Sequence, residues 1–95
     1  MEKHRPTQLR RCILTTLYES FRAFPYLQVE PDQLMASCGV EPDDLNWNLV
    51  YLEKCGFVEL SKTYTVAPHV ATGIAITVAG IDLVENKPAF AERFP

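Results

Sequence analysis

Several features that would mark an enzyme or a metalloprotein are missing from this 95-residue chain. Its four glycines are scattered, so there is no glycine-rich loop to hold a phosphate group. Its three cysteines lack the paired spacing of a zinc site. Neither His4 nor His69 has a serine or cysteine at a catalytic motif spacing, and the neighbours Asp43 and Asp44 would point about 100° apart on a helix. We therefore expect no catalytic residues, no metal and no cofactor.

Long apolar runs are missing as well. The longest fall far short of the ~18 residues that suggest a membrane span, and the first residues lead into an amphipathic segment rather than a signal sequence. The composition, 47% hydrophobic and 22% charged, is typical of one soluble globular domain. We interpret Cys12, Cys38 and Cys55, an odd number, as reduced and partly buried thiols. The expectation is a cytoplasmic protein with no membrane partner.

Basic residues are scarce in the middle of the chain. Residues 1–22 hold five basic and two acidic residues, a balance of +3, whereas residues 23–60 hold seven acidic residues and only Lys54, a balance of −6. A surface that binds nucleic acid needs positive charge to neutralise phosphates. The central segment therefore has the wrong sign for a protein that binds nucleic acid there.

One start signal for a helix occurs twice in that acidic segment. Residues 29–32 and 40–43 both have the sequence Val-Glu-Pro-Asp, and a leucine follows each run two positions later. Proline fits the first helical position, and the following aspartate lies at the positive end of the helix dipole. Gly39, between the two runs, can end the first helix in a left-handed conformation. The pattern predicts helices over 31–38 and 42–55, joined by a tight turn.

Other elements follow from hydrophobic periodicity. Apolar residues at helical spacing predict a first helix from Pro6 to Arg22, and brief alternation predicts a short strand over 26–29. After Gly56 the period changes to two, which predicts a hairpin with one strand over 57–60 and 63–66, a loop over 67–73 and a returning strand over 74–77. A last helix over 78–86 starts after Thr77. The expected core is Ile13, Leu17, Leu34, Leu45, Leu49, Leu52 and Ile81.

These elements, in this order, resemble the winged helix-turn-helix superfamily. The segment Leu-Glu-Lys-Cys-Gly-Phe-Val at 52–58 and the segment Ile-Thr-Val-Ala-Gly-Ile-Asp from residue 76 are similar to segments of small prokaryotic regulators. The resemblance implies a mostly α protein with a small β-hairpin (α+β): three helices, a two-stranded wing and a C-terminal helix. It divides a single domain over 1–95 into a helix-turn-helix at 31–55, a wing at 57–77, a post-wing helix at 78–86 and a tail at 87–95.

The resemblance also implies double-stranded DNA as the partner, with the helix over 42–55 in the major groove and the wing on the backbone. Asparagine can hydrogen-bond an adenine edge, and cations contact phosphates. Asp43 and Asp44 nevertheless stand where the phosphates would lie. The candidate nucleic-acid-binding residues are Arg10, Arg11, Asn46, Asn48, Lys54, Lys62 and His69.

A second function, docking of a protein partner without DNA, is suggested by the same helix. Its core-facing side holds leucines. A helical wheel places Trp47, Val50 and Tyr51 on or beside the opposite side, where large apolar residues indicate a partner. In an alternative arrangement, Trp47 covers the gap beneath the wing. Phe90 and Phe94 in the tail should either pack on their own domain or join two copies. We favour a homodimer, because helices after the wing often dimerise in the resembling proteins.

Overall fold

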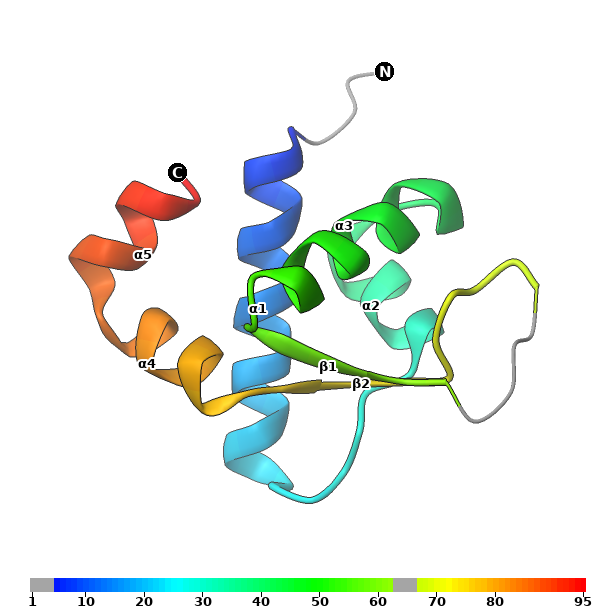
Figure 1. Ribbon diagram of the computed structural model, residues 1–95, viewed down its shortest axis with the longest axis horizontal. Coiled ribbons are helices and arrows are strands. Elements are labelled where there is room, and N and C mark those ends of the chain that lie inside the picture. Colours follow the sequence, from blue (N-terminus) through cyan, green and yellow to red (C-terminus); the bar gives the residue numbers. More distant parts are fainter. Residues whose placement is uncertain (1–4, 63–66) are drawn as a thin grey trace.

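The computed structural model describes residues 5–62 and 67–95 of the chain. Within these residues it contains helices and one two-stranded hairpin (Figure 1), so the predicted mostly α, α+β class is confirmed. No helix of this part of the chain is both long and apolar enough to cross a membrane. The elements are α1 (Pro6–Ala23), α2 (Pro31–Cys38), α3 (Pro42–Lys54), β1 (Val58–Ser61), β2 (Gly73–Ile76), α4 (Val78–Glu85) and α5 (Lys87–Arg93).

Helix α1 is the central element of the domain. It contacts α2, α3, β2 and α4, and Figure 1 shows α2 and α3 on one side of it, α4 and α5 on the other, and the hairpin running across it. Its apolar stripe is buried, in agreement with its helical spacing. One cluster of buried side chains joins all these elements, and its members include Ile13, Leu14, Leu17, Leu34, Leu45, Leu49, Leu52, Ile74 and Phe94. Ile81, which the spacing predicts to be in the core, packs at its edge.

Both repeated start signals begin helices at the predicted prolines. The turn between α2 and α3 uses Gly39 in the left-handed conformation, with φ 61°. A side chain bearing a Cβ is strained there, so glycine ends α2 at low cost. Gly56, with φ 84°, ends α3 in the same way and directs the chain into β1. The predicted helix boundaries differ from the observed ones by one residue at most.

The hairpin is antiparallel, with Val58 opposite Ile76 and Leu60 opposite Ile74. On its other edge, β2 pairs with Val29 alone among the described residues, and Val29 exchanges backbone hydrogen bonds of 2.8 and 2.9 Å with Ile74. The strand predicted over 26–29 is therefore wrong except for this one bridge, because Tyr26 and its neighbours form an exposed turn. The part of the hairpin predicted over 63–66 lies outside the described residues.

The C-terminal region forms α4 as predicted and a further helix, α5, that the periodicity does not predict. The Thr77 hydroxyl caps α4 by accepting a hydrogen bond from the Gly80 amide at 3.1 Å. At the C-terminal end of α4, the Tyr18 hydroxyl donates to the Glu85 carboxylate at 2.7 Å, and this hydrogen bond raises the pKa of Tyr18. The bond ties α4 to α1.

The tail packs on its own domain. Phe90 and Phe94 are 6% and 1% exposed, and each ring lies edge-on to another ring, with Phe94 6.3 Å from Phe57 and 6.4 Å from Phe90. Both phenylalanines are candidates for contact with a second copy when the sequence is considered alone. That use of the two side chains is corrected, because their apolar surface is already buried within one chain. The homodimer itself stays a prediction.

A disulfide joins Cys12 of α1 to Cys38 of α2, with 5.9 Å between their Cα atoms. The expectation of three reduced thiols is therefore wrong for these two residues, and only Cys55 keeps a free thiol. Cys12 packs against the buried core, and its partner Cys38 is the last residue of α2. The disulfide fixes the end of α2 against α1.

Candidate interaction surface on helix α3

Helix α3 has one buried side and one free side. Leu45, Leu49 and Leu52 are buried in the core, whereas Trp47 is 48% exposed. The arrangement that placed Trp47 in the core beneath the hairpin is therefore not observed. We call the free side the α3 outer face, and it consists of Asp43, Trp47, Val50 and Lys54.

Arg10 of α1 stacks on two aromatic rings, that of Trp47 on this face and that of Tyr51 beside it. Its guanidinium carbon lies 3.5 Å from the ring centre of Tyr51 and 5.4 Å from that of Trp47. Its Nε also donates to the Asn48 side-chain oxygen at 2.9 Å. Arg10 thus holds the two aromatic side chains in place.

The two asparagines expected to contact bases are used within the chain. Asn48 is 1% exposed, and its amide donates to the backbone oxygen of Asp44 at 2.7 Å. Asn46 donates to the Pro68 oxygen at 2.7 Å and accepts from the Val70 amide at 3.2 Å, so it holds the hairpin loop against α3. Asn48 cannot reach a base edge, and that prediction is corrected. Asn46 has both amide atoms engaged and serves as a clamp for the loop.

Other candidate nucleic-acid-binding residues also have partners in the chain. Lys62 forms an ion pair with Glu53 at 3.2 Å, which links the hairpin to α3. His69 Nε2 lies 3.4 Å from Asp32 of α2, and its Nδ1 is buried without a hydrogen-bond partner among the described residues. Arg11 donates to the Phe94 backbone oxygen at 3.4 Å on the α5 side of α1.

The charge on the α3 outer face is mixed but mainly negative at its start. Asp43 is exposed and Asp44 partly exposed in the first turn, and Glu41 is exposed just before it. Lys54 lies at the opposite end and has no carboxylate within ion-pair distance in the described residues. The face therefore offers an apolar centre next to several carboxylates.

The burial of Asn48 and its pairing with Arg10 both had a signal in the sequence that periodicity alone did not resolve. Asn48 lies at the margin of the leucine stripe, close enough to the core to be buried once a donor from α1 satisfies it. Arg10 lies one position from Leu9 on the α1 stripe. Polar residues at the edges of two facing apolar stripes are candidates for a pair between the helices.

Comparison of the chain with protein-family models, curated proteins and solved structures gives no match.

Proposed function

We propose that this domain is a winged helix-turn-helix module that docks a protein partner through the α3 outer face. The observation that carries the proposal is the exposure of Trp47 on a helix whose other side is fully packed. Tryptophan is among the residues that most often dominate binding energy when a partner buries it. The partner segment is expected to present an apolar side chain to Trp47 and Val50.

The charges next to Trp47 narrow the chemistry of the partner. Asp43, Asp44 and Glu41 surround the start of α3, and no basic residue of the described chain pairs with them within ion-pair distance. Carboxylates at the rim of an interface attract a basic partner and repel an acidic one. We therefore expect the docked segment to combine its apolar anchor with lysine or arginine.

The support beneath Trp47 favours tight docking. Tyr51 and Trp47 are held by Arg10, and Arg10 is held by Asn48 across the α1–α3 boundary. Side chains that are fixed before binding lose less conformational entropy when the partner arrives. The Arg10 stack thus prepares the surface, and we assign Arg10 and Tyr51 to positioning Trp47.

Duplex DNA is the second candidate, favoured by one observation. The hairpin loop is held beside α3 through Asn46, as a wing lies beside a reading helix, and Lys54 is exposed at the end of α3. Against it, Asn48 is buried, Lys62 is paired, and carboxylates occupy the first turn. DNA binding would have to rely on few phosphate contacts.

A selection from random peptides tests the docking proposal, because it does not require the partner to be identified first. Peptides displayed on phage are selected against the immobilised wild type, against Trp47→Ala and against Tyr26→Ala. Tyr26 is a matched control, since it is 99% exposed and lies on the turn after α1. We expect wild type and Tyr26→Ala to enrich the same peptides, each pairing a large apolar residue with lysine or arginine, and Trp47→Ala to lose them. Equal enrichment by Trp47→Ala, or enrichment of acidic peptides, would contradict the proposal.

A cytoplasmic location is also proposed, from the sequence alone; the Cys12–Cys38 disulfide weighs against it and provides its test. Disulfides are rare in reducing compartments, so the state of Cys12 and Cys38 in the cell is informative. Thiols are trapped by acid quenching of intact cells, alkylated under denaturing conditions and counted by mass spectrometry. Labelling of all three cysteines supports the cytoplasm, and labelling of Cys55 alone argues for an oxidising compartment.

A further inference from the structure

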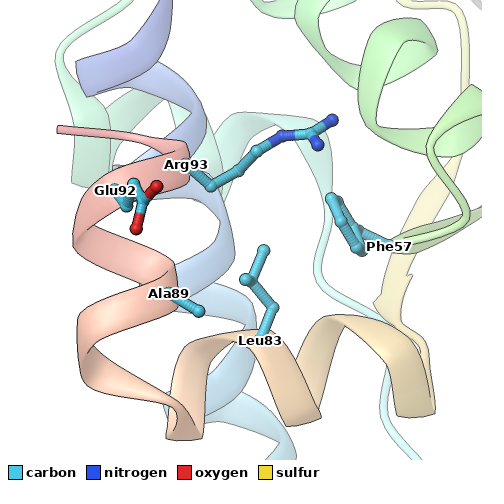
Figure 2. A pocket seen from close by; sticks show the side chains of 5 residues that line it. All are labelled: Phe57, Leu83, Ala89, Glu92 and Arg93. Carbon is cyan, nitrogen blue, oxygen red and sulfur yellow. The ribbon is translucent and has the colours of Figure 1, made fainter.

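A groove of about 450 Å³ lies between α4, α5 and the start of β1. Its lining is Phe57, Leu83, Ala89, Glu92 and Arg93. Figure 2 shows Leu83 and Ala89 pointing into the space between the two helices and Phe57, with the Arg93 side chain extended across it toward Phe57. The groove falls in the usual size range for small-molecule sites, ~300–1,000 Å³. It shares no residue with the α3 outer face.

The apolar side of the groove is firmly built. Gly80 allows α4 to approach β1, because a Cβ at this position would run into the Phe57 backbone oxygen. The Thr77 hydroxyl donates to the Gly56 oxygen at 2.6 Å, and the Thr77 amide donates to the Phe57 oxygen at 3.0 Å. The Phe57 ring itself rests edge-on against buried Phe94. The groove therefore exists before any ligand arrives.

Arg93 provides a cation at one side of this apolar surface. Its guanidinium carbon lies 5.6 Å from the Phe57 ring centre and 5.5 Å from that of Phe94, and one terminal nitrogen donates to the Cys55 sulfur at 3.4 Å. No carboxylate of the described residues lies within ion-pair distance of it. Glu92 points away from the guanidinium in Figure 2. A guanidinium has five donors in a planar fork, so most remain for a ligand.

We propose that this groove binds a small apolar monocarboxylate. The apolar part of the ligand packs on Phe57, Leu83 and Ala89, and its carboxylate pairs with the Arg93 guanidinium, whose fork matches a planar carboxylate in bidentate geometry. The carboxylate of Glu92 lies at the rim and adds a negative charge that disfavours dianions such as phosphate monoesters. A single positive charge beside an apolar surface thus selects a monoanion with an apolar body.

The test compares one ligand with its uncharged analogue. ¹⁵N-labelled protein is titrated with 4-phenylbutyrate, 4-phenylbutanamide and phenyl phosphate, and amide shifts are followed by NMR for wild type, Arg93→Gln and Arg22→Gln. Arg22 is the matched control, since it too lies at the surface over an aromatic ring, that of Tyr18. We expect the shifts to centre on Phe57, Leu83 and Ala89, and the acid to bind at least about tenfold more tightly than the amide or the phosphate.

Two variants separate binding from folding. Arg93→Gln should weaken the acid about tenfold and leave the amide unchanged, whereas Arg22→Gln should change neither. Because Arg93 also packs on Phe94, a second variant, Ala89→Leu, fills the groove while keeping the arginine, and it should abolish the shifts from both ligands. The proposal is overturned if acid and amide bind equally, if Arg93→Gln binds the acid like wild type, or if millimolar acid shifts no groove amide. None of these outcomes bears on docking at α3.

Discussion

Helices α2 and α3 begin with the same four-residue signal and end in different roles. Helix α2 has 8 residues, buries Pro31, Leu34 and Cys38, and is attached to α1 by a disulfide. Helix α3 has 13 residues, buries a row of leucines and leaves Trp47 exposed. Local start chemistry thus sets where each helix begins. The function of each is set later, by its length and by which of its sides meets α1.

The largest effect on stability should come from the core-facing side of α3, which is buried as the core-facing side of α2 is. Leu49→Ala is expected to lower the free energy of unfolding by about 2–5 kcal/mol, because it leaves a cavity in the packed core, and Leu52→Ala should behave alike. Val50→Ala, one position along and half-buried, should cost much less. Urea unfolding measures all three. Wild-type stability of both leucine variants would show that the phase of α3 is wrong.

The next largest effect on stability comes from the disulfide, which distinguishes α2 from α3. The disulfide closes a loop across a sequence separation of 26 residues and attaches α2 to α1, whereas it does not involve α3. Chain-entropy arguments give about 3–4 kcal/mol for a loop of this length. Cys38→Ser should therefore destabilise the oxidised protein by about that amount, and a reductant should destabilise wild type equally while leaving Cys38→Ser unchanged.

The control for the disulfide is Cys55→Ser, which removes the free thiol at the end of α3. It should respond to reductant like wild type. Thermal unfolding with and without dithiothreitol measures these effects. If the reductant left wild-type stability unchanged, the disulfide would contribute nothing to stability, and α2 would be held no more firmly than α3.

The smallest effect on stability should come from the first turns of α2 and α3. The Glu30 amide donates to the Gln33 side chain at 2.9 Å at the start of α2, whereas the same position of α3 holds Asp44, which makes no such bond among the described contacts. Gln33→Ala should cost about 1 kcal/mol or less, the usual size of a capping contribution. Asp44→Ala should cost less than that, through the helix dipole alone. A larger loss from Asp44→Ala, measured by urea unfolding, would show that its carboxylate has a structural partner.

Much of the fold could be predicted because its signals are local. Proline at a first turn, glycine at a helix end and Thr77 before α4 each act within a few residues, and all three predictions agree with the structure. The hairpin followed from a change of period after Gly56. Such features depend on the backbone of a short segment, which the sequence contains in full.

The features that sequence reasoning misses depend on contacts between distant segments. The bond between Cys12 and Cys38 requires α1 and α2 to meet at one point, and spacing along the chain does not show this. Asn48 is assigned to a base on sequence grounds because its donor, Arg10, is 38 residues away along the chain. The tail is expected to need a second copy, since nothing local shows that Phe57 receives Phe94. The arrangement of the site therefore depends on contacts between distant segments, whereas most of the helices and strands depend on local signals.

The most direct test of the central claim is calorimetric titration of the best selected peptide, and of duplex DNA, at low and moderate salt. Trp47→Ala is compared with Tyr26→Ala, and Lys54→Ala is included for DNA. We predict that the peptide binds with little salt dependence, that Trp47→Ala loses about 2 kcal/mol or more, and that Tyr26→Ala binds like wild type. We also predict no duplex binding. Duplex binding that weakens by ~0.9 log unit per log unit of salt for each phosphate neutralised, and that Lys54→Ala reduces, would contradict docking and support DNA.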